Sequence, residues 1–165
     1  MSIAGLFPGQ GSQSLGMLAE LSESFSIVSA TFQEASDALG RDLWQIAQEG
    51  PEAALNNTEN TQPLMLAAGV ACLRVWQKQD GAALAALAGH SLGEYSALVA
   101  ADVLAFTDAV KLVGERARLM QSAVPAGEGA MAAILGLDDA QIVAACETAA
   151  QGDVVEAVNF NSPGQ

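Results

Sequence analysis

The sequence predicts an α/β fold with a parallel sheet, followed by a second, smaller unit. Short apolar runs bounded by glycine or proline alternate with longer amphipathic stretches, an order typical of strands separated by helices. The segment 125–129 is rich in proline and glycine, so we expect it to be a linker. The two units are therefore expected over residues 1–124 and 125–165.

The strands and helices are predicted from run length and from the residues that bound each run. The apolar run 3–7 ends at a Pro-Gly pair, and the run 84–88 lies between two glycines, so both predict buried strands. Pro63, in the first turn of an apolar stretch, and Asp138, before another stretch, are helix start signals. In chain order, the predicted elements are a strand 3–7, helices 19–39, 44–55 and 61–77, a strand 84–88, helices 94–100 and 109–122, a strand 130–135, a helix 138–150 and a strand 154–160.

The charge balance narrows the classes of partner. The 165 residues carry a formal net charge of −13, from 6 Lys and Arg against 19 Asp and Glu. Phosphates and anionic lipids need clustered cations, so we expect neither nucleic acid nor a membrane as a partner. The N-terminal residues lack the cations of a signal peptide, and the apolar stretches fall short of the ~18 residues that suggest a membrane span. We therefore expect a cytoplasmic protein.

The cysteines and the histidine do not predict a metal site. Cys72 and Cys146 form no C-x-x-C pair, and His90 is the only histidine of the sequence. One histidine cannot complete a Cys/His zinc site, so we expect no metal and two buried, reduced thiols.

Residues 89–93 read Gly-His-Ser-Leu-Gly and match the pattern G-x-S-x-G, between a predicted strand and a predicted helix. A sharp turn from strand to helix exposes the hydroxyl of Ser91, and the backbone N–H of Leu92 lies at a helix N-terminus, where it can stabilise an oxyanion. A chance match in a glycine-containing loop is the alternative. The strand–turn–helix context favours Ser91 as a nucleophile.

A nucleophilic serine needs a base within about 3 Å of its hydroxyl. His90 is adjacent to Ser91, and adjacent side chains diverge in a tight turn, so we expect His90 to be a support residue. Either the base lies elsewhere in a longer protein, or the chain is not catalytic alone.

Three further polar residues are site candidates. Arg116 lies on the apolar stripe of its predicted helix, where it either pairs with an acidic residue of the chain or binds a substrate carboxylate. Gln10 follows the first strand, so its backbone N–H either completes an oxyanion hole at the sheet edge or belongs to an ordinary turn. Gln62 is a hydrogen-bonding candidate whose default role is a helix cap or turn.

Five ordered motifs together resemble the malonyl-CoA:acyl-carrier-protein transacylase family of bacterial type II fatty-acid synthesis. The segments are residues 7–13 (Phe-Pro-Gly-Gln-Gly-Ser-Gln), 61–63 (Thr-Gln-Pro), 89–95 (Gly-His-Ser-Leu-Gly-Glu-Tyr), Arg116, and 159–165 (Asn-Phe-Asn-Ser-Pro-Gly-Gln). The resemblance implies that Ser91 carries the malonyl group. It assigns the oxyanion hole to the amides of Gln10 and Leu92, the malonyl carboxylate to Arg116, and a place in the acyl pocket to Gln62.

The same resemblance implies a fold, partners and a missing part. The family has an α/β-hydrolase-like domain with an inserted ferredoxin-like subdomain, of which residues 1–124 match the front part and 125–165 the first β-α-β. Malonyl-CoA and acyl carrier protein are the implied partners, without a metal or bound cofactor. Family members are about twice as long, and their catalytic histidine lies in the half that is absent here. We therefore expect a fragment that is inactive and aggregation-prone alone.

Three rival functions remain open from the sequence. One lies within acyl transfer, namely a domain of a polyketide synthase or an enzyme that loads a different extender unit. A serine esterase or thioesterase with the same turn would resolve the acyl-serine with water, although such an enzyme has no need of Arg116. A non-catalytic module that binds the carrier protein would never form an acyl adduct.

Overall fold

The computed structural model describes residues 2–125 and 127–165. It is an α/β structure that divides into two compact units, Met1–Pro125 (unit 1) and Ala126–Gln165 (unit 2). Within the described residues, no helix is long and apolar enough to span a membrane.

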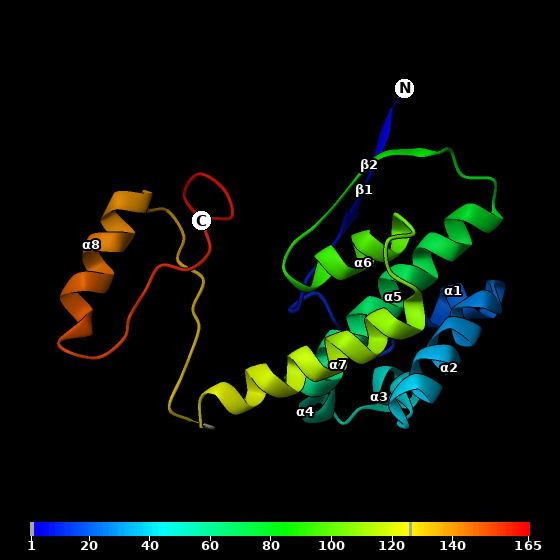
Figure 1. Ribbon diagram of the computed structural model, residues 1–165, viewed down its shortest axis with the longest axis horizontal. Coiled ribbons are helices and arrows are strands. Elements are labelled where there is room, and N and C mark those ends of the chain that lie inside the picture. Colours follow the sequence, from blue (N-terminus) through cyan, green and yellow to red (C-terminus); the bar gives the residue numbers. More distant parts are fainter. Residues whose placement is uncertain (1, 126) are drawn as a thin grey trace. The chain divides into compact units, whose positions relative to one another are not determined.

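Unit 1 contains a sheet of two parallel strands, β1 (Ile3–Phe7) and β2 (Leu84–Gly89), as the sequence predicts (Figure 1). Phe7, the last residue of β1, lies opposite Gly89, the last residue of β2, so the two strands end together. Both strands pack against α6 (Leu92–Ala100), the helix that follows β2. The loops after the two strands therefore open at the same edge of the sheet.

Helix α5 (Thr58–Lys78) is the centre of unit 1. It packs against α2 (Ile27–Leu39), α6 and α7 (Phe106–Ala123), and most of its residues between Thr61 and Val75 are buried. A helix that is apolar on nearly every side belongs in a core rather than at a surface. The core cluster of buried side chains accordingly runs along α5, with Phe32 of α2 and Val113 of α7 against it.

Two predicted helices are each broken in the structure. The predicted helix 19–39 divides into α1 (Ala19–Ser24) and α2, because Phe25 between them takes an extended backbone with φ −136° and ψ 98°. The predicted helix 44–55 divides into α3 (Leu43–Glu49) and α4 (Glu52–Leu55). Pro51 causes the second break, since proline has no N–H to donate and disfavours helical geometry in the residue before it.

Helix α5 begins three residues earlier than predicted, so that Pro63 lies inside it. Asn57 caps the helix with its side-chain oxygen, which accepts from the amide of Glu59 at 2.9 Å. Pro63 has no N–H to donate to the carbonyl four residues before it, that of Glu59. Nη2 of Arg41 donates to this carbonyl oxygen instead, at 2.6 Å. A side chain from another part of unit 1 thus satisfies the acceptor that the proline leaves free.

An apolar groove of about 550 Å³ lies beside β1 and α5. Leu6 of β1 remains 77% exposed, although parallel sheets usually have both faces covered. Cys72 lines the groove and is exposed, and Cys146 of unit 2 is only half-buried, so the prediction of two buried thiols is wrong. The apolar side chains around Cys72 nevertheless raise the pKa of its thiol.

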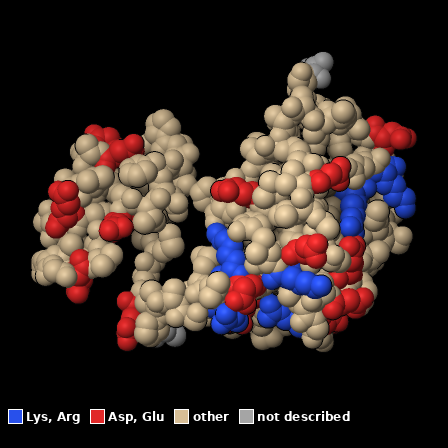
Figure 2. All heavy atoms as spheres, viewed as in Figure 1, with Lys and Arg blue, Asp and Glu red and all other residues tan. Residues whose placement is uncertain are grey.

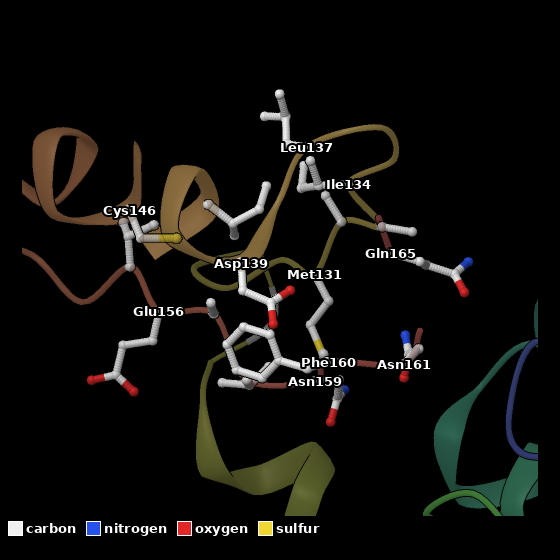
Figure 3. Close-up of a pocket in the computed structure, with 16 residues that line it drawn as sticks. Met131, Ile134, Leu137, Asp139, Cys146, Glu156, Asn159, Phe160, Asn161 and Gln165 are labelled. Atoms are coloured by element: carbon white, nitrogen blue, oxygen red, sulfur yellow. The ribbon is translucent and has the colours of Figure 1, made fainter. Parts of the chain in front are cut away.

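In unit 2, helix α8 (Asp139–Ala150) agrees with the sequence, but the two predicted strands do not. Asp138 caps α8, accepting from the Gln141 amide at 2.8 Å while the Gln141 side chain accepts from the Asp138 amide. The segments 130–135 and 154–160 are not strands in the structure. Among the residues described, no backbone ladder joins them, and a strand requires a hydrogen-bonded neighbour. Instead they line one pocket of about 380 Å³ together with α8 (Figure 3).

The two units differ in charge. All Lys and Arg residues belong to unit 1, and every charged residue in the sequence of unit 2 is acidic. Figure 2 shows this contrast as blue and red groups on unit 1 against red groups alone on unit 2. In this sequence, only unit 1 therefore offers cations that can pair with an acidic group.

We expect Arg41→Met to destabilise unit 1 by about 1 to 2 kcal/mol, because the Glu59 carbonyl loses its donor. In a Pro63→Ala background the new amide can donate to that carbonyl, so the cost of Arg41→Met should fall below about 0.5 kcal/mol. Urea unfolding of the four proteins measures this coupling. Lys111→Met, which removes an exposed cation from α7, is the control and should change stability by less than about 0.5 kcal/mol. Equal costs in both backgrounds would contradict the assignment.

Candidate functional site

The turn at Ser91 joins β2 to α6 in two residues. Ser91 has φ 51° and ψ −107°, a region that residues with a side chain rarely adopt. Such a conformation costs on the order of 1 to 3 kcal/mol and persists only where the surrounding structure enforces it. The strand, strained serine and helix form the geometry that the G-x-S-x-G pattern predicts.

Two glycines make this turn possible. A Cβ built on Gly89 would overlap the backbone carbonyl of Gly93, and a Cβ built on Gly93 would overlap the carbonyl of Phe7 at the end of β1. The turn is therefore folded against itself and against the neighbouring strand. Neither position has room for a side chain.

The loop after β1 lies beside the turn. The amide of His90 donates to the carbonyl of Phe7 at 3.4 Å, and a Cβ on Gly9 would lie 2.9 Å from the His90 carbonyl oxygen. This loop carries Gln10, whose side-chain amide donates to Oγ1 of Thr58 at 3.0 Å, at the start of α5. Among the described backbone–backbone hydrogen bonds of loops and helix caps, none has the amide of Gln10 or of Leu92 as its donor.

Arg116 of α7 reaches the serine. Its Nη2 donates to Oγ of Ser91 at 2.8 Å, and its Nη1 donates to Oε1 of Gln62 in a short hydrogen bond. The centroid of the Tyr95 ring lies 5.7 Å from the guanidinium carbon. Helices α5 and α7 and the turn before α6 thus bring together Gln62, Arg116 and Ser91, which the sequence predicts as site residues but does not place in contact.

Gln62 is fully buried, with both ends of its amide engaged. Oε1 accepts from Arg116, and Nε2 lies 3.3 Å from the sulfur of Met120. Met120 and Tyr95 are site residues that sequence reasoning missed. Their signal is helical spacing, since Met120 comes four residues after Arg116 and Tyr95 four residues after Ser91.

Arg116 has no carboxylate partner among the residues described. The ion pairs in this part of the chain are Arg74–Glu34 at 2.7 Å and Arg118–Glu115 at 2.6 Å. Arg118 is two residues away on the same helix, and its hydrogen bond to Glu115 lowers the pKa of that carboxyl. The interpretation of Arg116 as half of an internal ion pair is therefore not supported.

Among the described residues, the side chain of His90 makes no hydrogen bond to Oγ of Ser91. The hydrogen-bond partner of Oγ of Ser91 is Arg116, and His90 is exposed beside the loop of Gly9. Within the described ranges, no group of three or more His, Cys, Asp and Glu lies close enough to hold a metal ion.

Comparison with known proteins gives a consistent result. Residues 6–165 match the family model described as "Acyl transferase domain". The chain is 63% identical, over 160 residues and 97% of its length, to the malonyl CoA-acyl carrier protein transacylase of Escherichia coli (strain K12). It superposes with a TM-score of 0.93 and 59% identity, over its whole length, on an acyl carrier protein S-malonyltransferase from Vibrio cholerae.

A third similar structure is a chain of a complex between a type II PKS acyl-carrier protein and its malonyl-transacylase, with a TM-score of 0.96, 58% identity and 99% of this chain covered. In each case this chain spans about half of the relative, namely 52% of the Escherichia coli protein, 54% of the Vibrio cholerae chain and 53% of the chain in the complex.

We expect Gly93→Ala to lower the free energy of unfolding by about 2 to 3 kcal/mol, because its methyl group would overlap the rigid carbonyl of Phe7. Gly114→Ala is a matched control, since Gly114 also lies within a helix and the added methyl would meet only the flexible end of Leu39. The control should stay within about 1 kcal/mol of the parent protein. The midpoints of urea unfolding measure both, and equal losses would argue against a close backbone approach at the turn.

Proposed function

The chain belongs to the acyl transferase domain family, and from this we propose that Ser91 takes a malonyl group from malonyl-CoA and passes it to the phosphopantetheine thiol of an acyl carrier protein, in fatty-acid biosynthesis. The hydrogen bond of 2.8 Å between Arg116 and Ser91 is the observation that carries the proposal. It joins the proposed nucleophile to a cation that has no carboxylate partner among the described residues, which suits an acyl group that carries a carboxylate.

The transfer proceeds in two halves. Oγ of Ser91 attacks the thioester carbonyl, the carbon–sulfur bond breaks, and coenzyme A leaves as a thiol with the proton that the serine loses. The carrier thiol then attacks the malonyl-serine ester, and Ser91 regains a proton as the ester bond breaks. No electrons are exchanged with a cofactor, and the two halves form a ping-pong sequence.

We assign the oxyanion hole to the backbone amides of Gln10 and Leu92. The loop of Gln10 lies beside the turn, and the amide of Leu92 opens helix α6. A helix N-terminus carries a partial positive charge, and fixed amide donors stabilise the negative oxygen of a tetrahedral intermediate.

Arg116 and Gln62 form the acyl-carboxylate end of the site. The planar guanidinium can donate two parallel hydrogen bonds to a carboxylate, and Gln62 fixes one of its nitrogens. An esterase that acts on uncharged acyl groups has no use for this cation, so the arrangement favours the transferase over the hydrolase.

We propose that the base is a histidine other than His90, the single histidine of these 165 residues. Arg116, the hydrogen-bond partner of Ser91, is a donor and cannot accept a proton at neutral pH. We therefore propose that the chain alone is inactive, and that a longer protein that supplies the histidine is active in the cytoplasm.

We further propose that residues 1–124 are the front part of an α/β-hydrolase-like domain and residues 125–165 the first half of a ferredoxin-like subdomain. In the first unit, the exposed Leu6 and the groove beside β1 leave room for further elements. In the second unit, the segments around Met131 and Phe160 face one pocket without pairing, as the separated strands of a split β-α-β unit do before a third strand enters (Figure 3).

The carrier protein is proposed to dock away from unit 2. Acyl carrier proteins are acidic, and unit 2 has acidic residues without a single Lys or Arg in its sequence (Figure 2). Like charges on facing surfaces oppose association.

The function is tested by intact mass after brief exposure to malonyl-CoA and an acid quench. A protein of the relatives' full length should gain one malonyl group, lose it to added carrier protein, and gain none as Ser91→Ala. The 165-residue chain should gain none. A full-length protein without an adduct would overturn the transferase, and an adduct that only water removes would indicate a hydrolase.

Arg116→Ala should lower the rate of malonyl transfer by on the order of 100-fold, because two charge-assisted hydrogen bonds are lost. Arg116→Lys is the matched variant, which keeps the charge but not the planar fork, and should recover only part of the rate. Steady-state transfer to the carrier protein measures both.

The proposed strand slot in unit 2 makes a separate prediction. Backbone amides of residues 131–135 and 154–160 should exchange rapidly in the 165-residue chain and slowly in the full-length protein, where a strand would pair with both. Hydrogen exchange read by mass spectrometry measures this, with helix α8 as the internal reference. Equal exchange in the two proteins would contradict the ferredoxin-like assignment.

A further inference from the structure

We infer that Arg116 also restrains the nucleophile: in the protein without substrate it holds Oγ of Ser91, and the carboxylate of the incoming acyl group draws it away. The inference rests on the proposed function for the identity of that acyl group. It adds to the binding role of Arg116 a release step that takes place at the nucleophile itself.

The guanidinium is shared between a permanent and a replaceable partner. Nη1 bonds Oε1 of Gln62, which is fully buried and whose Nε2 is engaged by Met120. Nη2 bonds Oγ of Ser91 at 2.8 Å, at the exposed end of the site. A ligand that enters from solvent therefore meets the bond to Ser91 first, while Gln62 keeps the arginine within reach.

A carboxylate competes well for this bond. A guanidinium pairs more strongly with a carboxylate than with a neutral hydroxyl, because the first contact joins opposite charges. Glu115, the acidic residue adjacent to Arg116 in the sequence, is held by Arg118 through two hydrogen bonds of 2.9 and 2.6 Å. Among the described residues, this adjacent carboxylate is thus already engaged and does not compete with the substrate for Arg116.

The contact also bears on reactivity. A hydroxyl oxygen that accepts a hydrogen bond has one lone pair engaged, and the donor occupies space beside it that an incoming carbonyl needs. Ser91 is thus a poorer nucleophile while Arg116 is bound to it. An acyl thioester without a carboxylate meets the restrained serine, so selection acts on the chemical step as well as on binding.

Free malonate separates the two roles of Arg116. Malonate brings the carboxylate without a thioester, and a small uncharged fluorophosphonate labels reactive serines without a carboxylate. In the full-length protein we expect saturating malonate to speed the labelling of Ser91 by about three- to tenfold, the gain expected from releasing one hydrogen bond. Simple occupation of the site by malonate would slow the labelling.

Two variants of helix α7 complete the experiment. Arg116→Met should label faster than the parent protein and show no response to malonate. Arg118→Met removes the neighbouring arginine, which is exposed and paired with Glu115, and should keep the full response. Circular dichroism checks that both variants are folded, and the response of the parent protein does not depend on either variant.

Slower or unchanged labelling of the parent protein with malonate would overturn the inference, as would a response that persists in Arg116→Met. Absence of labelling in all proteins would also overturn it, since a serine restrained only by Arg116 must react. If malonyl-CoA forms a malonyl adduct but malonate does not speed the labelling, the transferase function stands and the restraint by Arg116 is rejected. If malonate speeds the labelling but malonyl-CoA forms no adduct, the restraint stands and the transferase function is rejected.

Discussion

The close approach of Gly93 to the carbonyl of Phe7 is the constraint on which the site depends. It places the start of α6 against the end of β1, and so brings together two loops that are distant in the sequence. With the backbone this close, Ser91 takes a strained conformation with φ 51°. The strain is stable only because the paired strands and α6 fix both ends of the turn. The proposed oxyanion donors and the proposed nucleophile therefore share one sheet edge because this connection is so tight.

Features encoded by adjacent residues were predictable, and features that need a distant partner were less so. The pattern of glycines around Ser91 identifies the turn, because steric room is a local requirement. The position of Arg116 on its helix is also visible in the sequence, but not that it contacts Ser91, because periodicity assigns a face and not the residue that lies opposite. The segments 130–135 and 154–160 show the limit most clearly. Their composition suits strands, but a strand exists only with a neighbour.

Two predicted helices are each broken in the structure, for different reasons. Pro51 is a visible break, and an apolar pattern on both sides of it suggested one continuous helix. Phe25 has no local breaking signal, and its extended backbone is paired with a side chain that packs against the core. Pro63 shows the opposite case, in which Arg41 compensates a residue that usually ends a helix. Tertiary contacts thus interrupt one helix at Phe25 and allow another to continue past Pro63, where local propensity predicts otherwise.

The parallel pairing of β1 with β2 also fixes an order of assembly. β1 is made first, but Phe7 pairs with Gly89, and the helices α1 to α5 lie between them. During synthesis those helices can form from local contacts before β2 is available to pair with β1. Closing the long loop between the two strands is also slow compared with forming a helix. The turn at Ser91 then forms, and Arg116 is synthesised later still. A nascent chain from which Gly89 has emerged but Arg116 has not would therefore hold Ser91 at the end of the β1–β2 pair, without the contact that Arg116 makes.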